Sequence, residues 1–269
     1  MHIQKRLCLA VLAAGLLSAP VFAATDAATE ASLKAALASK DRAPANAARD
    51  PARHPLETLK FFGLKNDMAV LEVWPGGGWW TEFLAPVLAE KGRYVGADPS
   101  MPDKSSTAKR VKELAAKNPA FAKAEIVEMS ATKTNPVPAG SMDMVLTFRN
   151  IHNWMSDGKE KVMFDAMFTA LKPGGYLGIE EHRAKAGAAD DKGGSGYVKE
   201  DAAIKMAEAS GFKLVSKSEI NANPKDTKDY PKGVWTLPPN YAEGDKDRAK
   251  YQAIGESDRF TLLFQKPAR

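Results

Sequence analysis

The chain has 269 residues, of which 44% are hydrophobic and 26% charged, values that exclude a disordered or collagen-like protein. Its formal net charge is +5, with the basic residues scattered among acidic ones, which argues against a nucleic-acid partner. The length suits one large domain with a sizeable core.

Residues 1–23 have the features of a secretory signal peptide. Lys5 and Arg6 precede an uncharged apolar run from Leu7 to Val21, and Ala23 is a small residue of the kind that a signal peptidase requires. The run is shorter than the roughly 20 residues of a membrane-spanning helix. We therefore expect cleavage near Ala23, no stable membrane anchor, and a periplasmic or secreted protein. Cys8, the one cysteine, lies in this segment, so the mature chain can form no disulfide.

Residues 24–53 are rich in alanine and poor in aromatic residues, and we interpret them as a lead-in with a short helix over 30–39. A helix is predicted over 55–62. From Met68 on, apolar runs of strand length alternate with helical patterns. Strands are predicted over 69–73, 93–97, 124–129, 142–148, 176–180, 212–220 and 259–265, and helices over 79–90, 106–117, 157–171 and 198–210. This order predicts an α/β domain over 54–269, with a mostly parallel sheet covered on both faces.

The connection over 221–258 is too long for an ordinary loop. It is polar and interrupted by four prolines, yet it also contains large, mainly apolar side chains such as those of Tyr230 and Trp235. We predict a lid over an acceptor pocket. The alternative is a loop packed permanently on the outer helices.

A glycine-rich turn follows the first predicted strand and opens into a helix. Ligands of such sheets bind beyond the carboxyl ends of the strands, and Gly76, Gly77 and Gly78 let backbone amides approach a ligand closely. Asp98 ends the second strand, twenty residues after the turn, where a carboxylate can accept hydrogen bonds from ribose hydroxyls. The pattern predicts a nucleoside-type ligand.

Glu72, two residues before Trp74-Pro75, bears on which nucleoside that is. A buried carboxylate in this strand would repel a pyrophosphate but would attract the sulfonium and ammonium groups of S-adenosylmethionine. The alternative is that Glu72 only pairs with backbone amides of the turn. A nicotinamide-dependent oxidoreductase is disfavoured by Glu72 and by the absence of a Tyr-x-x-x-Lys pair.

Four segments in this order resemble the motifs of class I S-adenosylmethionine-dependent methyltransferases: residues 70–78, 94–100, 140–146 and 171–177. The resemblance runs from about Pro55 to the C-terminus and is greatest to an exported subgroup known as predicted methyltransferases. It implies a Rossmann-like three-layer sandwich whose seven-stranded sheet is mostly parallel, with 259–265 antiparallel between the fifth and sixth strands. It also implies S-adenosylmethionine as cofactor and methyl transfer to a small molecule or envelope component.

The chain departs from the family pattern at two places. Trp74-Pro75 stands where the family usually begins its turn with glycine, and the indole either shapes the methionine end of the pocket or fills it. After the third strand the family often has an acid for the adenine amino group, whereas this chain offers only the Ser130 hydroxyl.

Candidate catalytic residues follow the fourth and fifth strands at the same edge of the sheet. His152 is proposed as general base, with Asn150 and His182 beside it, and Arg149 is assigned to the cofactor site. Alternatively, His152 starts the next helix and only hydrogen-bonds the backbone, or it binds a metal with Glu181 and His182. We assign no metal. The rival to an enzyme is a non-catalytic exported protein that binds a nucleoside or another metabolite in the same pocket.

Overall fold

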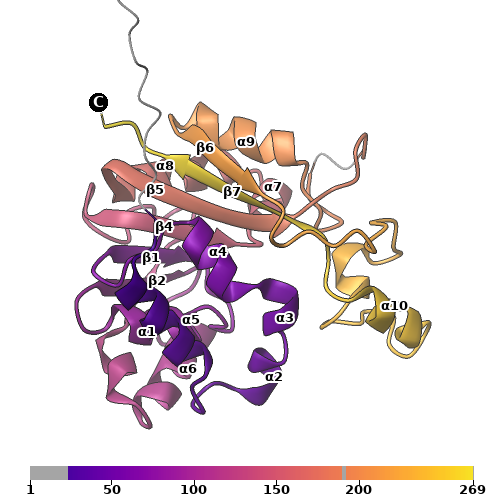
Figure 1. Cartoon of the computed structure of the whole chain (residues 1–269). Helices are drawn as coiled ribbons and strands as arrows, with labels where there is room; N and C mark the ends of the chain where they lie inside the picture. The colour runs from indigo at the N-terminus through magenta and orange to yellow at the C-terminus, as the bar shows by residue number, and fades with distance from the viewer. Residues whose placement is uncertain (1–23, 190–191, 269) are drawn as a thin grey trace, which may run out of the picture.

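The computed structural model describes residues 24–189 and 192–268, so the predicted signal peptide lies outside the described residues. Its centre is a seven-stranded sheet in the order β3-β2-β1-β4-β5-β7-β6 (Figure 1). The strands are β1 (Ala69–Val73), β2 (Arg93–Asp98), β3 (Glu125–Glu128), β4 (Met142–Phe148), β5 (Leu171–His182), β6 (Lys213–Ser218) and β7 (Arg259–Gln265). β1 to β5 are parallel, and β7 pairs antiparallel with both β5 and β6. The predicted fold class and the place of the last strand are confirmed.

Helices cover both faces of the sheet. One face carries α1 (Ala27–Leu37), α4 (Pro55–Phe61), α5 (Thr81–Leu88) and α6 (Ser106–Ala115), whose apolar side chains share one buried cluster. The other face carries α7 (Ile151–Ser156), α8 (Glu160–Ala170) and α9 (Glu200–Ala209). The shorter helices are α2 (Pro44–Ala47), α3 (Asp50–Arg53), η1 (Pro119–Lys123), η2 (Gly233–Thr236) and α10 (Arg248–Ile254).

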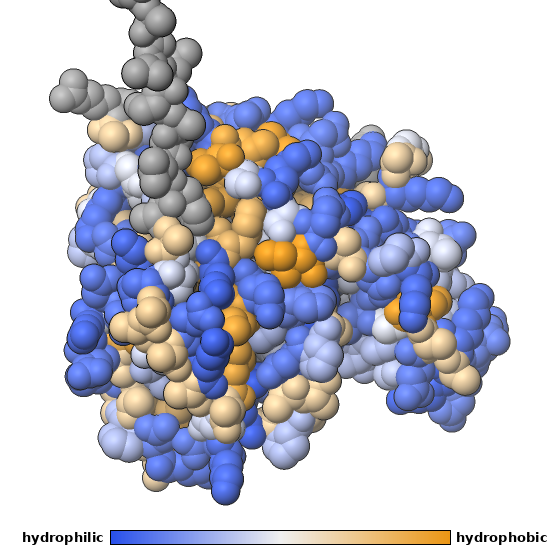
Figure 2. Space-filling model, in the orientation of Figure 1, coloured by the Kyte–Doolittle hydropathy of each residue, from blue (hydrophilic) through white to orange (hydrophobic). Residues whose placement is uncertain are grey.

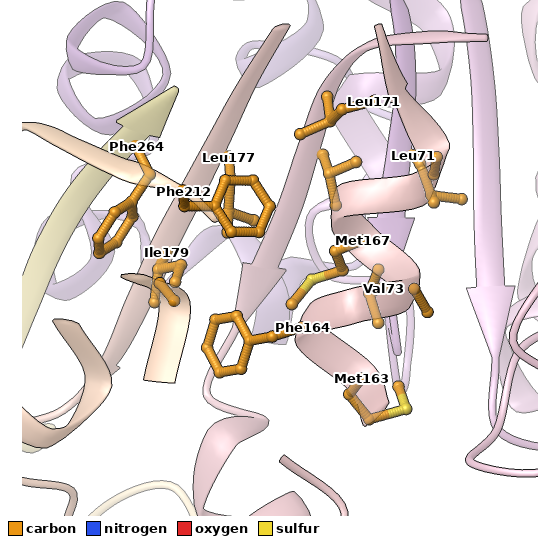
Figure 3. Packing of buried hydrophobic residues seen from close by; sticks show 14 of the residues in the cluster. Leu71, Val73, Met163, Phe164, Met167, Leu171, Leu177, Ile179, Phe212 and Phe264 are labelled. Atoms are coloured by element: carbon orange, nitrogen blue, oxygen red, sulfur yellow. The ribbon is translucent and has the colours of Figure 1, made fainter. Parts of the chain in front are cut away.

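The packing of α8 on the sheet shows how the strand pattern builds the core (Figure 3). Leu71 and Val73 of β1 point to the same face, because side chains two residues apart share a face, and there they belong to one cluster with Phe164 and Met167 of α8. All four are fully buried. Each such side chain contributes about 1.5–3 kcal/mol through burial. Glu72 lies between Leu71 and Val73 and therefore points to the opposite face.

The helix predicted over 157–171 is α8, which begins three residues later than predicted. A separate short helix, α7, precedes it, and Gly158, with a φ of +63°, follows the end of α7. A positive φ interrupts a right-handed helix and suits glycine because glycine has no Cβ. β5 is longer than the strand predicted over 176–180, since it runs from Leu171 to His182.

Residues 24–53 are largely helical and pack on the domain. Asp26 caps α1 by accepting a hydrogen bond from the backbone N–H of Thr29 at 2.7 Å, and Leu33 is buried in the same cluster as α5. The helices α2 and α3 continue from α1 to the edge of the sheet where β7 begins (Figure 1).

The connection over 221–258 leaves β6, forms η2 and α10, and returns as β7. It lies beside the carboxyl ends of the parallel strands (Figure 1), and its outer surface around α10 is mostly hydrophilic (Figure 2). Trp235 is one of its few exposed large apolar side chains, with 36% of its surface accessible.

Candidate functional site

A cavity of about 320 Å³ lies at the carboxyl edge of the sheet. Its floor comes from the turn after β1 and from the residues after β4 and β5. Its walls come from α2 and α3 on one side and from the 221–258 segment on the other. The predicted residues that it brings together are Gly76, Gly77, Arg149, Asn150, His152 and His182.

The glycine turn leaves space for a ligand. Gly76 has a φ of +62°, and a Cβ added at Gly76 or Gly77 would meet no atom within 4 Å. A Cβ at Gly78 would make only an ordinary contact with the Arg110 side chain at 3.4 Å, so the φ of +77° is the reason that glycine is favoured there. The open space above Gly76 and Gly77 fits a ligand that approaches the backbone, as S-adenosylmethionine does in the family that the sequence resembles.

The Asp98 carboxylate lies next to this turn but is occupied by the chain's own hydroxyls. Oδ1 accepts a hydrogen bond from Ser100 Oγ at 2.9 Å, and Oδ2 accepts bonds from Ser105 Oγ at 2.9 Å and Thr107 Oγ1 at 3.1 Å. Thr107 also donates to the carbonyl of Gly76 at 2.7 Å. Asp98 therefore ties the start of α6 to the glycine turn, and a ribose would bind by its remaining lone pairs or by displacing these hydroxyls.

Glu72 does not line the cavity; it is 1% exposed and points towards α5. It accepts hydrogen bonds from the hydroxyls of Tyr94 at 2.6 Å and Thr81 at 3.3 Å, rather than from backbone amides of the turn. Burial raises the pKa of Glu72 to about 7, although the two hydroxyls oppose this shift.

Trp74 interrupts the groove along which the cofactor is expected to lie. Its backbone is in the left-handed region, with a φ of +54°, and its indole N–H donates to the carbonyl of Met129 at 2.9 Å. The ring packs edge-on against Trp154, with centroids 5.8 Å apart. The indole thus reaches from the end of β1 to the end of β3.

A second cavity, of about 270 Å³, lies on the other side of this indole. It is lined by Pro99, Ser130, Trp154 and neighbouring residues, and Trp74 lines both cavities. Ser130, predicted to meet the adenine, therefore lies in a separate compartment from the glycine turn. A single ligand that reached from the glycine turn to Ser130 would have to pass the Trp74 indole, which lines both cavities.

His152 and Glu181 form a pair at the first cavity. Nδ1 of His152 lies 3.1 Å from Oε1 of Glu181, and the other carboxylate oxygen accepts a hydrogen bond from the backbone N–H of Ile151 at 2.7 Å. The carboxylate thus holds the start of α7 and favours the histidine tautomer with its proton on Nδ1. In that tautomer Nε2 is the nitrogen that accepts a proton.

His182 and Asn150 lie beside this pair. The His182 ring is 5.6 Å from that of His152, and its Nδ1 is 2.5 Å from the hydroxyl of Ser257. Burial and the nearby His152 and Arg149 lower the pKa of His182 well below its usual range, so its ring stays neutral. The Asn150 amide donates to the carbonyl of Val73 at 2.9 Å, which makes Asn150 a positioning residue for the end of β1.

The ligand atoms of His152, Glu181 and His182 lie within 4.8 Å of one another, so their geometry alone would allow a divalent cation. Two features argue against this use. The Glu181 oxygens already accept backbone hydrogen bonds, including one from the N–H of His182 at 2.9 Å. Arg49, Arg53 and Arg149 line the same cavity and would repel a cation.

Three charged residues of the cavity wall were not predicted from the sequence: Arg49, Arg53 and Glu256. The first two belong to the alanine-rich lead-in, and the third to the long connection before β7. The one available signal was the pair of arginines four residues apart, which places both on one face of a helix.

Comparisons with known proteins agree with this geometry. Residues 70–175 match the family model described as a methyltransferase domain. A methyltransferase from Aquifex aeolicus that depends on S-adenosylmethionine superposes with a TM-score of 0.56 at 18% identity, covering 81% of this chain and 93% of its own. The [4+2]-cyclase SpnF superposes with a TM-score of 0.58 at 17% identity, covering 86% of each chain. No curated protein sequence matches the chain.

The chain therefore has the Rossmann-like fold of methyltransferases that depend on S-adenosylmethionine, and residues 70–175 match a methyltransferase-domain model.

Proposed function

We propose that the protein transfers a methyl group to a hydroxyl or amine of a small molecule, with His152 as general base. The observation that carries this proposal is that one cavity contains both the open glycine turn and the His152–Glu181 pair. When bound, S-adenosylmethionine supplies an electrophilic methyl group. His152 accepts the proton that the acceptor loses as its oxygen or nitrogen bonds to the methyl carbon.

Glu181 supports this step by position and charge. Its carboxylate is fully buried and in contact with Nδ1, so it stabilises the imidazolium formed when Nε2 takes the proton. Asn150 holds the carbonyl at the end of β1, and thereby the turn on which the cofactor rests. The contact with Glu181 supports this role over the alternative that His152 only hydrogen-bonds the backbone at the start of a helix.

The test uses the mature chain and a His152→Asn variant, which keeps a polar side chain but has no basic nitrogen. Both should bind S-adenosylmethionine with similar affinity in calorimetry. With methyl-labelled cofactor and a metabolite extract, only the wild type should transfer label to a small molecule, as detected by mass spectrometry. Absence of cofactor binding would refute the proposal. Binding without transfer would favour the non-catalytic alternative, and the similarity to SpnF, a cyclase, means that the fold alone does not decide between them.

We further propose that the protein acts outside the cytoplasm, as a periplasmic or secreted enzyme. Support comes from the basic start and apolar run of residues 1–23, and from α1, which begins only a few residues after Ala23. Within the described residues, no helix has the length and apolar character needed to cross a membrane. Mass spectrometry of the periplasmic fraction should find a chain that begins at Ala24, and an intact chain confined to the cytoplasm would contradict the proposal.

A further inference from the structure

Three arginines that line the cavity have buried guanidinium nitrogens without hydrogen-bond partners among the described residues. Arg53 lines it with a side chain only 1% exposed, and neither of its terminal nitrogens has a partner among the described residues. Nη2 of Arg49 and Nε of Arg149 are likewise buried and unpartnered within the described chain. Leaving buried charged donors unpaired is costly, so their arrangement points to a ligand that supplies the acceptors.

The charged side chains that line the cavity indicate whether that ligand is an anion or a cation. Three arginines, Arg49, Arg53 and Arg149, line the cavity against one carboxylate, Glu256, which leaves an excess of two positive charges. Burial alone would raise the pKa of Glu256, but Arg53, Arg259 and Arg49 together lower it to about 2. Glu256 is therefore ionised, and the excess of two positive charges already counts its negative charge. Arg259 lies behind the wall, where it pairs with Glu180 at 2.9 Å and also with Glu256 at 3.4 Å. Arg259 and Glu180 have opposite charges, so including both leaves the excess at two.

We propose that Arg49, Arg53 and Arg149 bind the carboxylate or phosphate group of the methyl acceptor, which is therefore a small anionic molecule. This inference rests on the proposed function for the identity of the acceptor. The anionic group would bind at the arginines while the nucleophilic hydroxyl or amine meets His152 in the same cavity.

The setting of Arg53 suits a carboxylate or phosphate. Its Nε donates to Glu256 at 3.2 Å, and its guanidinium lies over the ring of Trp79 at 4.5 Å. These two contacts fix the plane of the group, so the two remaining nitrogens form a rigid fork. Such a fork matches the paired oxygens of a carboxylate or phosphate, and it loses little entropy on binding because it is already ordered.

The cofactor also carries a carboxylate, on its methionyl end, and this is the other source of the same chemistry. Charge favours the acceptor. S-adenosylmethionine has two positive groups and one negative, so its binding adds a positive charge to a wall that already has an excess of two. An anionic acceptor offsets that charge, whereas a neutral or cationic one leaves it uncompensated.

Calorimetry with inorganic phosphate tests the site without the need for turnover. The mature chain is titrated with phosphate, first alone and then with saturating S-adenosylhomocysteine, the demethylated cofactor. Phosphate should bind in both titrations. Arg53→Met should weaken phosphate binding at least tenfold, because it removes charge-assisted hydrogen bonds, and should leave the affinity for S-adenosylhomocysteine within about twofold.

Two further variants keep the test interpretable. Arg49→Gln is milder, because 22% of the Arg49 side chain is exposed, and it should weaken phosphate in the same direction if Arg53→Met does not fold. Arg42→Met is the matched control. Arg42 is equally buried but pairs with Asp50 at 2.5 and 2.8 Å outside the cavity, and its loss should leave phosphate affinity unchanged.

The outcomes separate this inference from the proposed function. If the wild-type protein does not bind phosphate, the acceptor site is refuted. It is also refuted if phosphate and S-adenosylhomocysteine compete, because the arginines would then bind the carboxylate of the cofactor. If phosphate binds but S-adenosylhomocysteine does not, the anion site stands and the methyltransferase proposal fails.

Discussion

Replacement of Trp74 by glycine should strengthen cofactor binding. Trp74 lines both the cavity at the glycine turn and the cavity at Ser130. A cofactor that reaches from Gly76 to Ser130, as the sequence predicts, would span both. Glycine removes the ring, and it also accepts the φ of +54° that a tryptophan adopts only with strain.

The size of the effect follows from the contacts of the indole. Displacing it breaks the hydrogen bond to the Met129 carbonyl, worth about 1 kcal/mol, and the edge-on contact with Trp154, worth about another 1 kcal/mol. A conformational cost of about 2 kcal/mol lowers the apparent affinity about 30-fold, because only the open form binds. Trp74→Gly removes this cost, so the dissociation constant of S-adenosylmethionine should fall by about that factor.

Stability should change in the opposite direction. Removal of a half-buried indole costs about 2–3 kcal/mol, of which about 1 kcal/mol returns through relief of the left-handed backbone. For a domain of this size, a net loss of about 1–2 kcal/mol lowers Tm by about 2–8 °C. The variant should therefore bind its cofactor more tightly while melting earlier, a combination that general damage to the fold does not produce.

Calorimetry and thermal melts of the same preparations provide the assay. The control is Trp80→Leu, since Trp80 is 2% exposed, stacks on Phe148 at 3.9 Å and lines neither cavity. It should lower Tm without a gain in affinity. If Trp74→Gly binds S-adenosylmethionine no better than the wild type, or more weakly, the indole is part of the binding surface and the partition argument is wrong.

Three other outcomes are expected. Asp98→Ala should weaken cofactor binding at least tenfold, and Gly76→Val should abolish it; unchanged affinity in both would contradict the placement of the cofactor. Because the pKa of Glu72 is raised to about 7 in the folded protein, its protonated carboxyl stabilises the fold. This stabilisation is complete below about pH 4.5, the unfolded pKa, and is lost as the pH rises through 7. Relative to Glu72→Gln, the wild type should thus lose about 3 kcal/mol between pH 4.5 and 8 in urea melts, and a constant difference would refute this. If 221–258 is a lid, amide exchange around Trp235 should be fast in the free protein and slow once cofactor and acceptor are bound, whereas slow exchange throughout would make it a fixed wall.

The sequence was sufficient for the fold because the core pattern is local. Apolar strands alternating with helical patterns predicted every strand of the sheet and the longer helices that cover it, but not the short helices α2, α3, α7 and α10. It was also sufficient to place Gly76, Gly77, Asn150, His152 and His182 together, since parallel strands end at one edge. The cofactor-binding role expected for Glu72 could not be predicted reliably from the same patterns, because it depended on the direction in which one side chain points. The alternation that buries Leu71 and Val73 on one face turns Glu72 to the other.

The charged wall of the cavity could not be predicted from the same patterns. Arg53 and Glu256 are 203 residues apart, and nothing local to either segment indicates that they meet at 3.2 Å. Their meeting depends on how α3 and the end of the long connection both pack over the carboxyl edge of the sheet. Non-local packing of this kind leaves no periodic signal in the chain.

Trp79 explains why the lead-in segment is part of the site. It follows the glycine turn directly, its indole N–H donates to the carbonyl of Asn46 at 2.9 Å, and its ring supports the Arg53 guanidinium at 4.5 Å. A single side chain therefore fixes α2 and Arg53 relative to the glycine turn. Because the turn, Trp79 and Arg53 are in contact in sequence or in space, the proposed cofactor and acceptor sites would be held at a fixed distance by packing rather than by a flexible loop. Methyl transfer needs such fixed alignment, since the nucleophile has to approach the methyl carbon at close range.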